Sequence, residues 1–413
     1  MTPLDLAYAV AAAVLAPWWM RKARGDWPAR KGHTPALQPS TPDRRRLLLH
    51  AVSVGEVNAL RHLVGLLTPH CDLVISVGTD TGIARARELF SSQARVVRYP
   101  IDFSRCVRRF LDAVKPDAVG LVELEVWPNF VRECRLRRVP ITVINGRLSE
   151  RSFRGYRRLR PFLRSTFASI EHAAVQDADY QERFVAMGVP RDRCTITGSM
   201  KWDAAAIADP DEIPQAIPLR DAMGIDPSRP LIVAGSTAED EEALLHAACP
   251  PGVQLLCAPR KPEHFDAAAD AMPGCVRRSI PGSGSRASDR FLLDTIGELR
   301  AAYALADIAV IGRSFGTLFG SDPIEPAALG KPVLIGPAYT DFTNIVETLR
   351  LAKGITIARR DSLSRVLADW LDHPDKRAAA AQNARQAIRS AQGASRRHAD
   401  LLLSLLQRSA VSG

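Results

Sequence analysis

The feature that most constrains the fold is the alternation of short Val/Ile/Leu-rich runs with helix-forming stretches along most of the 413 residues. Such runs are typical of strands buried on both faces, and strands separated by helices form parallel sheets. The runs expected as strands in the first half are RLLLHAVSV, DLVISVG, ARVVRYP, AVGLVELE, PITVING, HAAVQ and CTITGS. In the second half they are PLIVAGS, VQLLCAPR, DIAVIGRS, KPVLIGP and GITIA. The sequence therefore predicts an α/β protein with two doubly wound sheets.

The boundary between the two predicted domains is the stretch from 204 to 230, which contains five prolines and no strand pattern. A chain of this length is also too long for one ordinary core. The predicted organisation is an N-terminal membrane anchor (1–30), a Rossmann-like domain (31–205), a linker (206–230), a second Rossmann-like domain (231–375) and a helical tail (376–413). No GxGxxG follows a strand, which disfavours a dehydrogenase.

The net charge of +10 is distributed unevenly along the chain. Residues 1–203 hold 32 Lys and Arg against 20 Asp and Glu, whereas the remainder holds 23 against 25. A basic half favours a polyanionic partner, either nucleic acid, anionic lipid or a phosphorylated glycolipid, and mere solubility is the alternative. The seven cysteines are scattered singly without a CxxC, which indicates a reducing compartment and no zinc site.

The segment LDLAYAVAAAVLAPWWM, residues 4–20, is apolar except for Asp5 and is followed by basic residues. Its length is at the lower limit for crossing a bilayer of about 30 Å. The aromatic pair Trp18-Trp19 and the basic flank are typical of a membrane interface, with the following chain on the cytoplasmic side. We therefore expect an N-terminal membrane-anchoring helix, spanning or interfacial. The alternative is a buried helix of the first domain.

A second basic segment, NGRLSERSFRGYRRLRPFLR, interleaves aromatic residues with seven arginines. These are Arg147, Arg151, Arg154, Arg157, Arg158, Arg160 and Arg164. An amphipathic basic segment of this kind lies on an anionic membrane or binds phosphates. A nucleic-acid surface has a similar composition, so these residues alone leave both partners open.

Three strand-to-helix junctions carry a hydroxyl residue three positions before a glutamate: Ser53 before Glu56, Ser236 before Glu239, and Thr295 before Glu298. This spacing predicts a capping box at each helix start. A helix start also attracts anions such as phosphate. The third of these junctions places a glycine, Gly297, inside the expected first turn, where it allows close approach by a ligand.

Isolated charges stand at other predicted strand ends. Glu123 and Glu125 end the run AVGLVELE, and alternation predicts that both lie on one face of the strand. Two such carboxylates are costly unless partnered, and an ion pair with an arginine is the simplest explanation. Arg260 at a strand end could hold a phosphate, and Lys201 could neutralise a developing negative charge. The pair Asp177 and Asp179 is expected to cap a helix rather than bind metal.

Taken together, the motifs HAVSVGE, ELEVWPN, NGRLSERS, GSMKWD, STAEDEE, APRKPEHF, DTIGEL and DPIEPAALGKPVLIGP resemble those of the 3-deoxy-D-manno-octulosonic acid (Kdo) transferases, in their order and at about their spacing. The resemblance covers nearly the whole chain. It implies a GT-B glycosyltransferase with two Rossmann-like domains facing a central cleft. It also implies transfer of Kdo, with inversion, from CMP-Kdo to a lipid A precursor at the cytoplasmic face of the cell inner membrane, in lipopolysaccharide biosynthesis.

The resemblance assigns Glu56 as the general base, and Glu125 and Lys201 as residues that stabilise the transition state. The residues it assigns to CMP binding are Pro259, Arg260, Ile296, Gly297, Glu298, Asp322, Pro323, Ile324 and Glu325. It implies no metal and no cofactor, and its partners are CMP-Kdo, the lipid A precursor and anionic lipids rather than nucleic acid. The alternatives are a GT-B enzyme that uses another nucleotide sugar on a membrane glycolipid, and a non-enzymatic polyanion- or lipid-binding protein that kept the scaffold.

The chain departs from the usual family pattern near the expected donor site. It has FGSDPIEP where the family usually has GGHNPLEP, so that Ser321 replaces a histidine and Asp322 an asparagine. An aspartate is an anion and should repel a phosphate that meets it closely. Arg313 replaces the second glycine of a usual pair. We hypothesise that its charge offsets that of Asp322.

Overall fold

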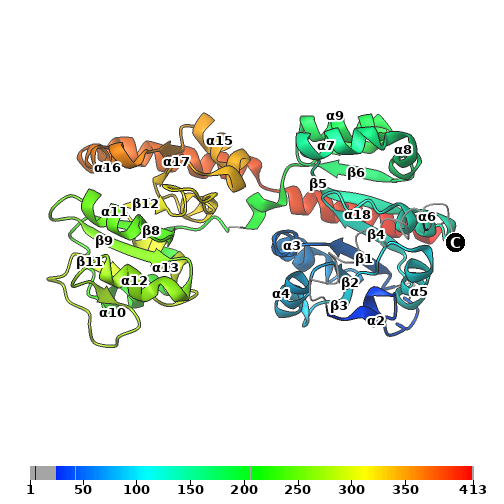
Figure 1. Cartoon of the computed structure of the whole chain (residues 1–413), viewed down its shortest axis with the longest axis horizontal. Coiled ribbons are helices and arrows are strands. Elements are labelled where there is room, and N and C mark those ends of the chain that lie inside the picture. Colours follow the sequence, from blue (N-terminus) through cyan, green and yellow to red (C-terminus); the bar gives the residue numbers. More distant parts are fainter. Residues whose placement is uncertain (1–4, 6–24, 42, 205, 412–413) are drawn as a thin grey trace, which may run out of the picture. The chain divides into compact units, whose positions relative to one another are not determined.

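The computed structural model describes residue 5 and residues 25–41, 43–204 and 206–411. The chain forms two compact units, of which unit 1 comprises Met1–Ala204 and Gln392–Gly413 and unit 2 comprises Ala205–Ala391. Each unit is built around a seven-stranded, entirely parallel sheet (Figure 1). The prediction of an α/β protein with two Rossmann-like sheets is therefore confirmed.

The expected N-terminal anchor, residues 4–20, lies outside the described residues except for Asp5. The Asp5 carboxylate is buried and accepts hydrogen bonds from the backbone N–H and the hydroxyl of Ser104, at 2.9 and 2.6 Å. Among the helices that the structure describes, none has the length and apolar character needed to cross a membrane.

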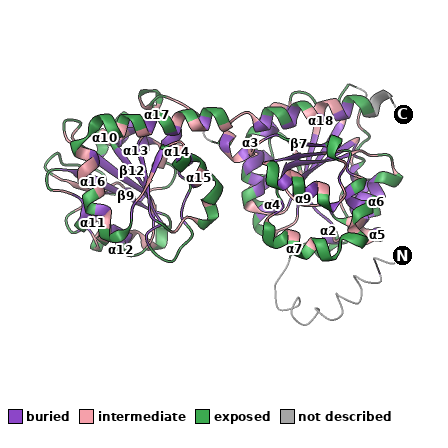
Figure 2. Ribbon diagram, turned by 90° about the horizontal axis from the view of Figure 1, so that it is seen from above, coloured by how far each residue is buried: buried purple, intermediate pink, exposed green. Residues whose placement is uncertain are grey.

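The sheet of unit 1 has the strand order β3-β2-β1-β4-β5-β6-β7. Its strands are β1 (Arg46–Ala51), β2 (Asp72–Val77), β3 (Arg95–Arg98), β4 (Ala118–Val122), β5 (Ile141–Gly146), β6 (His172–Val175) and β7 (Cys194–Ile196). Strands β1, β4 and β5 are buried along their whole length, which explains their continuous apolar sequences (Figure 2). The chain starts at β1 in the interior of the sheet and builds outward in both directions, as in a doubly wound fold.

Helices cover both faces of this sheet. They are α2 (Trp27–Arg30), α3 (Val54–Leu67), α4 (Asp80–Phe90), α5 (Ser104–Val114), α6 (Pro128–Leu136), α7 (Glu150–Arg158), α8 (Arg160–Ala168), α9 (Ala178–Met187) and α18 (Ala394–Val411), with 3-10 turns η1 (Arg191–Arg193) and η2 (Met200–Ala204). One core joins α3, α4 and α18 to the sheet, and a second core joins α5, α6, α8 and α9 to the opposite face. The sheet is therefore sealed on both sides, and only its edges and strand ends are open to ligands.

The sheet of unit 2 has the strand order β10-β11-β9-β8-β12-β13-β14. Its strands are β8 (Leu231–Thr237), β9 (Gln254–Pro259), β10 (Val276–Arg277), β11 (Arg290–Leu292), β12 (Ile308–Ile311), β13 (Val333–Ile335) and β14 (Ile355–Ile357). Its helices are α10 (Ala216–Met223), α11 (Glu241–Ala248), α12 (Phe265–Asp270), α13 (Leu299–Leu305), α14 (Ile324–Ala328), α15 (Thr343–Leu351), α16 (Leu363–Asp372) and α17 (Pro374–Ala391). Four 3-10 turns complete it: η3 (Pro210–Glu212), η4 (Pro262–His264), η5 (Thr340–Phe342) and η6 (Arg360–Ser362). Strands β10 and β11 were not expected, because runs of two and three residues give no readable pattern.

The two ends of the second predicted domain show features that the sequence did not indicate. The expected linker contains α10, which packs against α13 within unit 2. The expected tail divides, because α17 belongs to unit 2 whereas α18 packs on α3 and β4 of unit 1. Asp203 fixes the return of the chain, since its carboxylate accepts the backbone N–H groups of Gly393 at 2.7 Å and Ser395 at 2.6 Å.

The end of β12 lies so close to β8 that only glycine fits at position 312. A Cβ atom placed on Gly312 would stand 2.5 Å from the carbonyl oxygen of Ser236 and 2.5 Å from the Cα of Thr237. Both neighbours are backbone atoms and cannot rotate away. Gly65 in α3 is the opposite case, because a Cβ atom there meets nothing within 4 Å.

We expect Gly312→Ala to lower the free energy of unfolding by about 1–3 kcal/mol, because the methyl group must displace backbone. The matched change Gly65→Ala should raise it by about 0.5–1 kcal/mol, because alanine favours an open helical site. Urea unfolding followed by tryptophan fluorescence measures both values. A Gly312→Ala protein as stable as the wild type would contradict the close approach of β8 and β12.

Candidate active site

Glu56 lies at the amino end of α3, directly after β1, and only 9% of it is exposed. Its carboxylate accepts hydrogen bonds from the backbone N–H groups of Val52 at 2.9 Å and Ser53 at 3.2 Å, and from the Ser53 hydroxyl at 2.8 Å. The Ser53 hydroxyl in turn accepts the Glu56 N–H at 3.4 Å. The predicted capping box is confirmed here, and it fixes the direction of the carboxylate.

Glu123 and Glu125 follow the end of β4, but not as the strand alternation predicted. The strand ends at Val122, and Glu123 adopts a left-handed conformation with φ of 58°. The argument from alternation is therefore wrong, because the chain turns where the polar residues begin. The expected ion pair is also wrong. Among the described residues, no arginine or lysine lies within 4.0 Å of either carboxylate.

The three carboxyl groups influence one another. Burial, followed by the negative charge of Glu56, raises the pKa of Glu125 from 4.5 to about 7, while the Trp127 indole N–H, donated at 2.7 Å, opposes the rise. Burial and Glu56 also raise the pKa of Glu123, and the charges of Arg147 and Lys201 lower it.

Glu56, Glu125 and Lys201, which the sequence analysis predicted as catalytic, therefore belong to one cluster of charged residues. This cluster lies at the strand ends of unit 1. Their individual roles stay predictions. The group contains two kinds of carboxyl: Glu56 is surrounded by donors, and Glu125 is half-buried beside other negative charges. Such a pair can divide the work of a base and an acid, because the two environments favour different protonation states.

His50 on β1 also belongs to this group, although the sequence analysis missed it. It is fully buried, and its ring stacks on Tyr99 with centroids 3.6 Å apart. Its Nε2 atom lies 3.9 Å from the Glu125 Oε2 atom. The available signal was a single histidine inside the aliphatic run LLLHAV. A polar side chain in a fully buried strand requires a partner.

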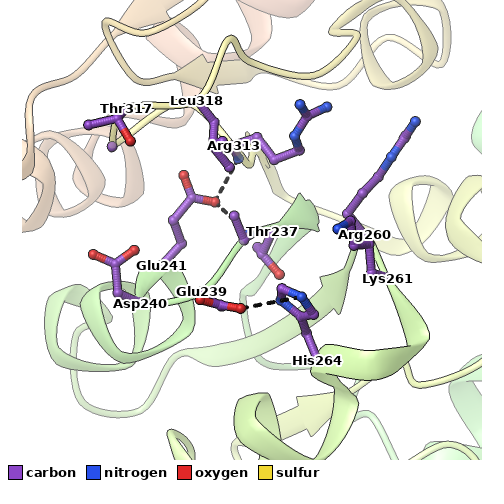
Figure 3. A pocket seen from close by; sticks show the side chains of 12 residues that line it. Thr237, Glu239, Asp240, Glu241, Arg260, Lys261, His264, Arg313, Thr317 and Leu318 are labelled. Atoms are coloured by element: carbon purple, nitrogen blue, oxygen red, sulfur yellow. Dashed lines mark hydrogen bonds and ion pairs between the residues drawn. The ribbon is translucent and has the colours of Figure 1, made fainter. Parts of the chain in front are cut away.

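Unit 2 contains a pocket of about 660 Å3 at the carboxyl ends of β8, β9 and β12 (Figure 3). This edge is the switch point of the sheet, where the chain order reverses and ligands bind in such folds. Four basic residues line the pocket: Arg260, Lys261, His264 and Arg313. The acidic residues beside them are already paired, Glu239 with His264 at 3.3 Å and Asp240 with Arg360 at 3.1 Å.

Within the described part of the chain, the guanidinium groups of Arg260 and Arg313 have neither a hydrogen bond nor an ion pair. Figure 3 shows both side chains extended rather than folded against the pocket acids. Two uncommitted guanidinium groups provide planar donors that suit phosphate or carboxylate oxygens. The pocket can therefore bind an anion.

The junction at α11 differs from the predicted capping box. The helix begins at Glu241, while Ser236 still belongs to β8 and Glu239 pairs with His264. Glu241 instead accepts three backbone N–H groups from the loop after β12, those of Arg313 at 2.6 Å, Ser314 at 2.9 Å and Phe315 at 3.0 Å. This buried carboxylate holds the loop that carries Arg313, and local spacing could not reveal it because the partner is 72 residues away.

The third predicted capping box is also wrong. Helix α13 begins only at Leu299, and Gly297 lies in the preceding bend with φ of 97°, a conformation incompatible with a helical turn. Glu298 accepts the Thr295 hydroxyl at 2.5 Å and the Arg278 guanidinium at 2.9 Å. Ile296 beside it is 73% exposed.

Of the remaining residues assigned to CMP, Pro259 ends β9, and residues 322–325 lie at the start of α14. Asp322 accepts the backbone N–H of Ile324 at 2.9 Å, and Glu325 lies 3.8 Å from Arg300. Burial raises the pKa of Glu325, Arg300 lowers it, and the neighbouring Asp322 raises it. Of the predicted CMP residues, only Arg260 lines the 660 Å3 pocket.

In unit 1, Asp177 caps α9 as predicted, and its carboxylate accepts the N–H of Tyr180 at 2.8 Å.

Two parallel Rossmann-like sheets, with charged groups at the strand ends of each, define the GT-B-like fold. A glycosyltransferase from Rickettsia africae shares this fold, with a TM-score of 0.60 over 88% of this chain and 99% of that one, at 11% identity. A family model described as 3-Deoxy-D-manno-octulosonic-acid transferase (kdotransferase) matches residues 25–204.

Two relatives extend the match to almost the whole length. The chain is 33% identical to the 3-deoxy-D-manno-octulosonic acid transferase of Bordetella pertussis, over 96% of this chain and 98% of the relative. It is 30% identical to the protein of the same name from Haemophilus influenzae, over 89% of each. The chain therefore belongs to the Kdo transferase family, as its motifs indicated, and is a glycosyltransferase.

The raised pKa of Glu125 has a consequence for stability. The folded state holds this proton up to about pH 7 whereas an unfolded glutamate releases it near 4.5, so stability falls as pH rises through that interval. Glu125→Gln removes the buried charge and should raise the free energy of unfolding by about 1–3 kcal/mol at pH 8, with little gain at pH 4.5. Urea unfolding at both pH values tests this.

The exposed Glu171→Gln is the control and should change the stability by less than about 0.5 kcal/mol at either pH. An equal gain for Glu125→Gln at the two pH values would show that the effect does not come from ionisation.

Proposed function

We propose that this chain transfers a Kdo residue from CMP-Kdo to a hydroxyl of a lipid A precursor, with inversion at the sugar. Membership of the Kdo transferase family supports the reaction class and the sugar. The observation that carries the mechanism is the carboxyl group of Glu56, fixed by three donors beside Glu125 and Lys201 at one edge of unit 1.

In the proposed reaction the acceptor hydroxyl attacks the anomeric carbon of Kdo while its proton passes to the Glu56 carboxylate. The bond from that carbon to the CMP phosphate breaks, and CMP leaves with the electron pair. One displacement inverts the centre and needs a base but no covalent nucleophile. Lys201 is the proposed counter-charge for the negative charge that develops.

The proposed donor residues lie in unit 2. Arg260 offers its unpaired guanidinium to the phosphate of CMP. Glu325 suits the ribose, because a carboxylate can accept protons from both of its hydroxyl groups. Asp322 adds a negative charge close to Glu325, which leaves a different nucleotide sugar as the alternative donor. Competition by CMP and by UDP distinguishes the two donors.

The central test incubates the purified protein with CMP-Kdo and a lipid A precursor and reads the products by mass. We expect Kdo addition by the wild type, and a decrease in kcat of about 10²–10⁴-fold in Glu56→Gln, because the variant keeps the hydrogen-bonding shape but cannot take a proton. Glu88→Gln on the exposed side of α4 is the control and should retain full activity.

A Glu56→Gln protein with wild-type kcat would remove Glu56 from the mechanism. Absence of any Kdo transfer by the wild type, with transfer from another nucleotide sugar, would replace the donor.

We further propose that the enzyme acts at the cytoplasmic face of the cell inner membrane, where α7 and α8 dock on anionic lipid. Six arginines of these two helices are exposed: Arg151, Arg154, Arg157, Arg158, Arg160 and Arg164. Phe162 is 79% exposed and Leu159 is 55% exposed between them. Apolar tips among arginines suit the boundary between headgroups and acyl chains.

The triple change Arg157→Glu, Arg158→Glu and Arg160→Glu should release the full-length protein from vesicles that contain anionic phospholipid. Each arginine near such a surface contributes about 1 kcal/mol. The control reverses three exposed arginines of unit 2, Arg286, Arg365 and Arg389, which changes the net charge equally. Co-sedimentation measures binding, and equal loss in both proteins would show that net charge alone determines it.

A further inference from the structure

The chemistry of His50 follows from the bonds of its other ring nitrogen. The Nδ1 atom lies 3.1 Å from the Ser76 carbonyl oxygen and 3.1 Å from the Ser76 hydroxyl. The carbonyl can only accept, and the hydroxyl already donates its proton to the Leu49 carbonyl at 3.3 Å. The hydrogen of a neutral His50 ring is therefore on Nδ1, and Nε2 carries a lone pair that requires a donor.

That lone pair has no hydrogen-bond donor among the described residues, although His50 is completely buried. Burial lowers the pKa of His50 from 6.5 to about 3, against a rise from the Ser76 bond, so the ring stays neutral at working pH. A buried acceptor without a donor costs about 1–3 kcal/mol. An ion pair with Glu125 is excluded because the ring carries no charge.

The Glu125 carboxyl is the polar group next to this nitrogen, with Oε2 at 3.9 Å from Nε2. An ionised carboxylate cannot satisfy the lone pair, because both atoms are acceptors. A protonated carboxyl can, once a side-chain shift of about 1 Å brings the two atoms into hydrogen-bonding range. The Trp127 indole N–H donates to the same carboxyl oxygen at 2.7 Å.

The groups that act on Glu125 come from several elements. Glu56 on α3 and Glu123 in its own loop both oppose its ionisation. Tyr156 on α7 is raised in pKa by burial and by the charge of Glu125. Arg147 and Lys201 act on Glu123 rather than on Glu125, so none of the positive charges in the described chain favours ionisation of Glu125 directly.

We propose that His50 is a positioning residue that accepts a hydrogen bond from the protonated carboxyl of Glu125 and so keeps this carboxyl neutral beside the Glu56 carboxylate. In transfer, which rests on the proposed function, Glu56 takes the proton of the acceptor hydroxyl, while the one O–H of Glu125 stays on His50. The neutral Glu125 carboxyl thereby avoids a second negative charge beside Glu56 and beside the charge that develops in the reaction.

The pairing is tested without catalysis, by 15N NMR of the full chain labelled at histidine. His50→Gln identifies the His50 signals by their loss. We expect the His50 Nδ1 signal to stay that of a protonated nitrogen from pH 5 to 9. The Nε2 signal should move once, with a midpoint near pH 7, as Glu125 loses the proton that it donates.

Two matched variants identify the group that titrates. In Glu125→Gln the Nε2 signal should be independent of pH, because the amide N–H donates at every pH. In Glu123→Gln the movement should persist with its midpoint at lower pH, because a charge that raises the pKa of Glu125 is gone. The pairing would be overturned if the Nε2 chemical shift of the wild type did not change with pH. It would also be overturned if the pH dependence of this shift persisted in Glu125→Gln.

The use of the pair in catalysis has its own readout. The wild-type kcat should fall as pH rises through about 7. His50→Phe keeps a ring against Tyr99 but removes the acceptor, and should lower kcat about tenfold, while His50→Gln, which restores an acceptor, should recover most of it. A kcat that does not change across pH 7 would show that catalysis does not need a neutral Glu125. Complete absence of Kdo transfer would contradict the proposed function, and the NMR titration would still decide the pairing.

Discussion

In a parallel sheet the carboxyl ends of all strands lie at the same end of the sheet, and the rest of this structure depends on that constraint. Both faces of each sheet must be covered by helices, so polar residues gather where strands end. In unit 1 the ends of β1, β4 and β5 bring Glu56, Glu123 and Arg147 within range of each other's charge although they are far apart in sequence. In unit 2 the same geometry places Arg260 and Arg313 in one pocket.

The neighbouring hydrogen-bond donors distinguish the carboxyl groups at these strand ends. Glu56 is stabilised by the free N–H groups of a helix start, whereas Glu125 follows a strand into a turn and meets mainly other acids. Glu241 in unit 2 shows a third use of a buried carboxylate, since three backbone N–H groups from a distant loop surround it. One residue type thus serves as a candidate base, as a candidate neutral donor and as a structural anchor, according to the donors that surround it.

The sequence predicted what depends on periodicity and length. Continuous apolar runs identified all seven strands of the first sheet and five of the second, and the motifs identified the family. The sequence-based predictions were wrong where a residue distant in the sequence provides the hydrogen-bond or ion-pair partner. The glutamates at 239 and 298 matched the capping pattern, but His264 and Arg278 bind them instead. His50 was missed because its partners, Ser76 and Glu125, lie on other strand ends and the run LLLHAV reads simply as buried.

The return of the last helix to the first unit affects the order in which the protein can be completed. Helix α18 supplies Leu402, Leu405 and Leu406 to the core beneath α3. A ribosome delivers these residues only after all of unit 2 has been made. Until then part of one apolar face of the first sheet lacks its cover, and Asp203 lacks the two N–H groups that it binds in the folded protein. The helix α3 that carries the candidate base Glu56 thus acquires this support only after α18 has been made.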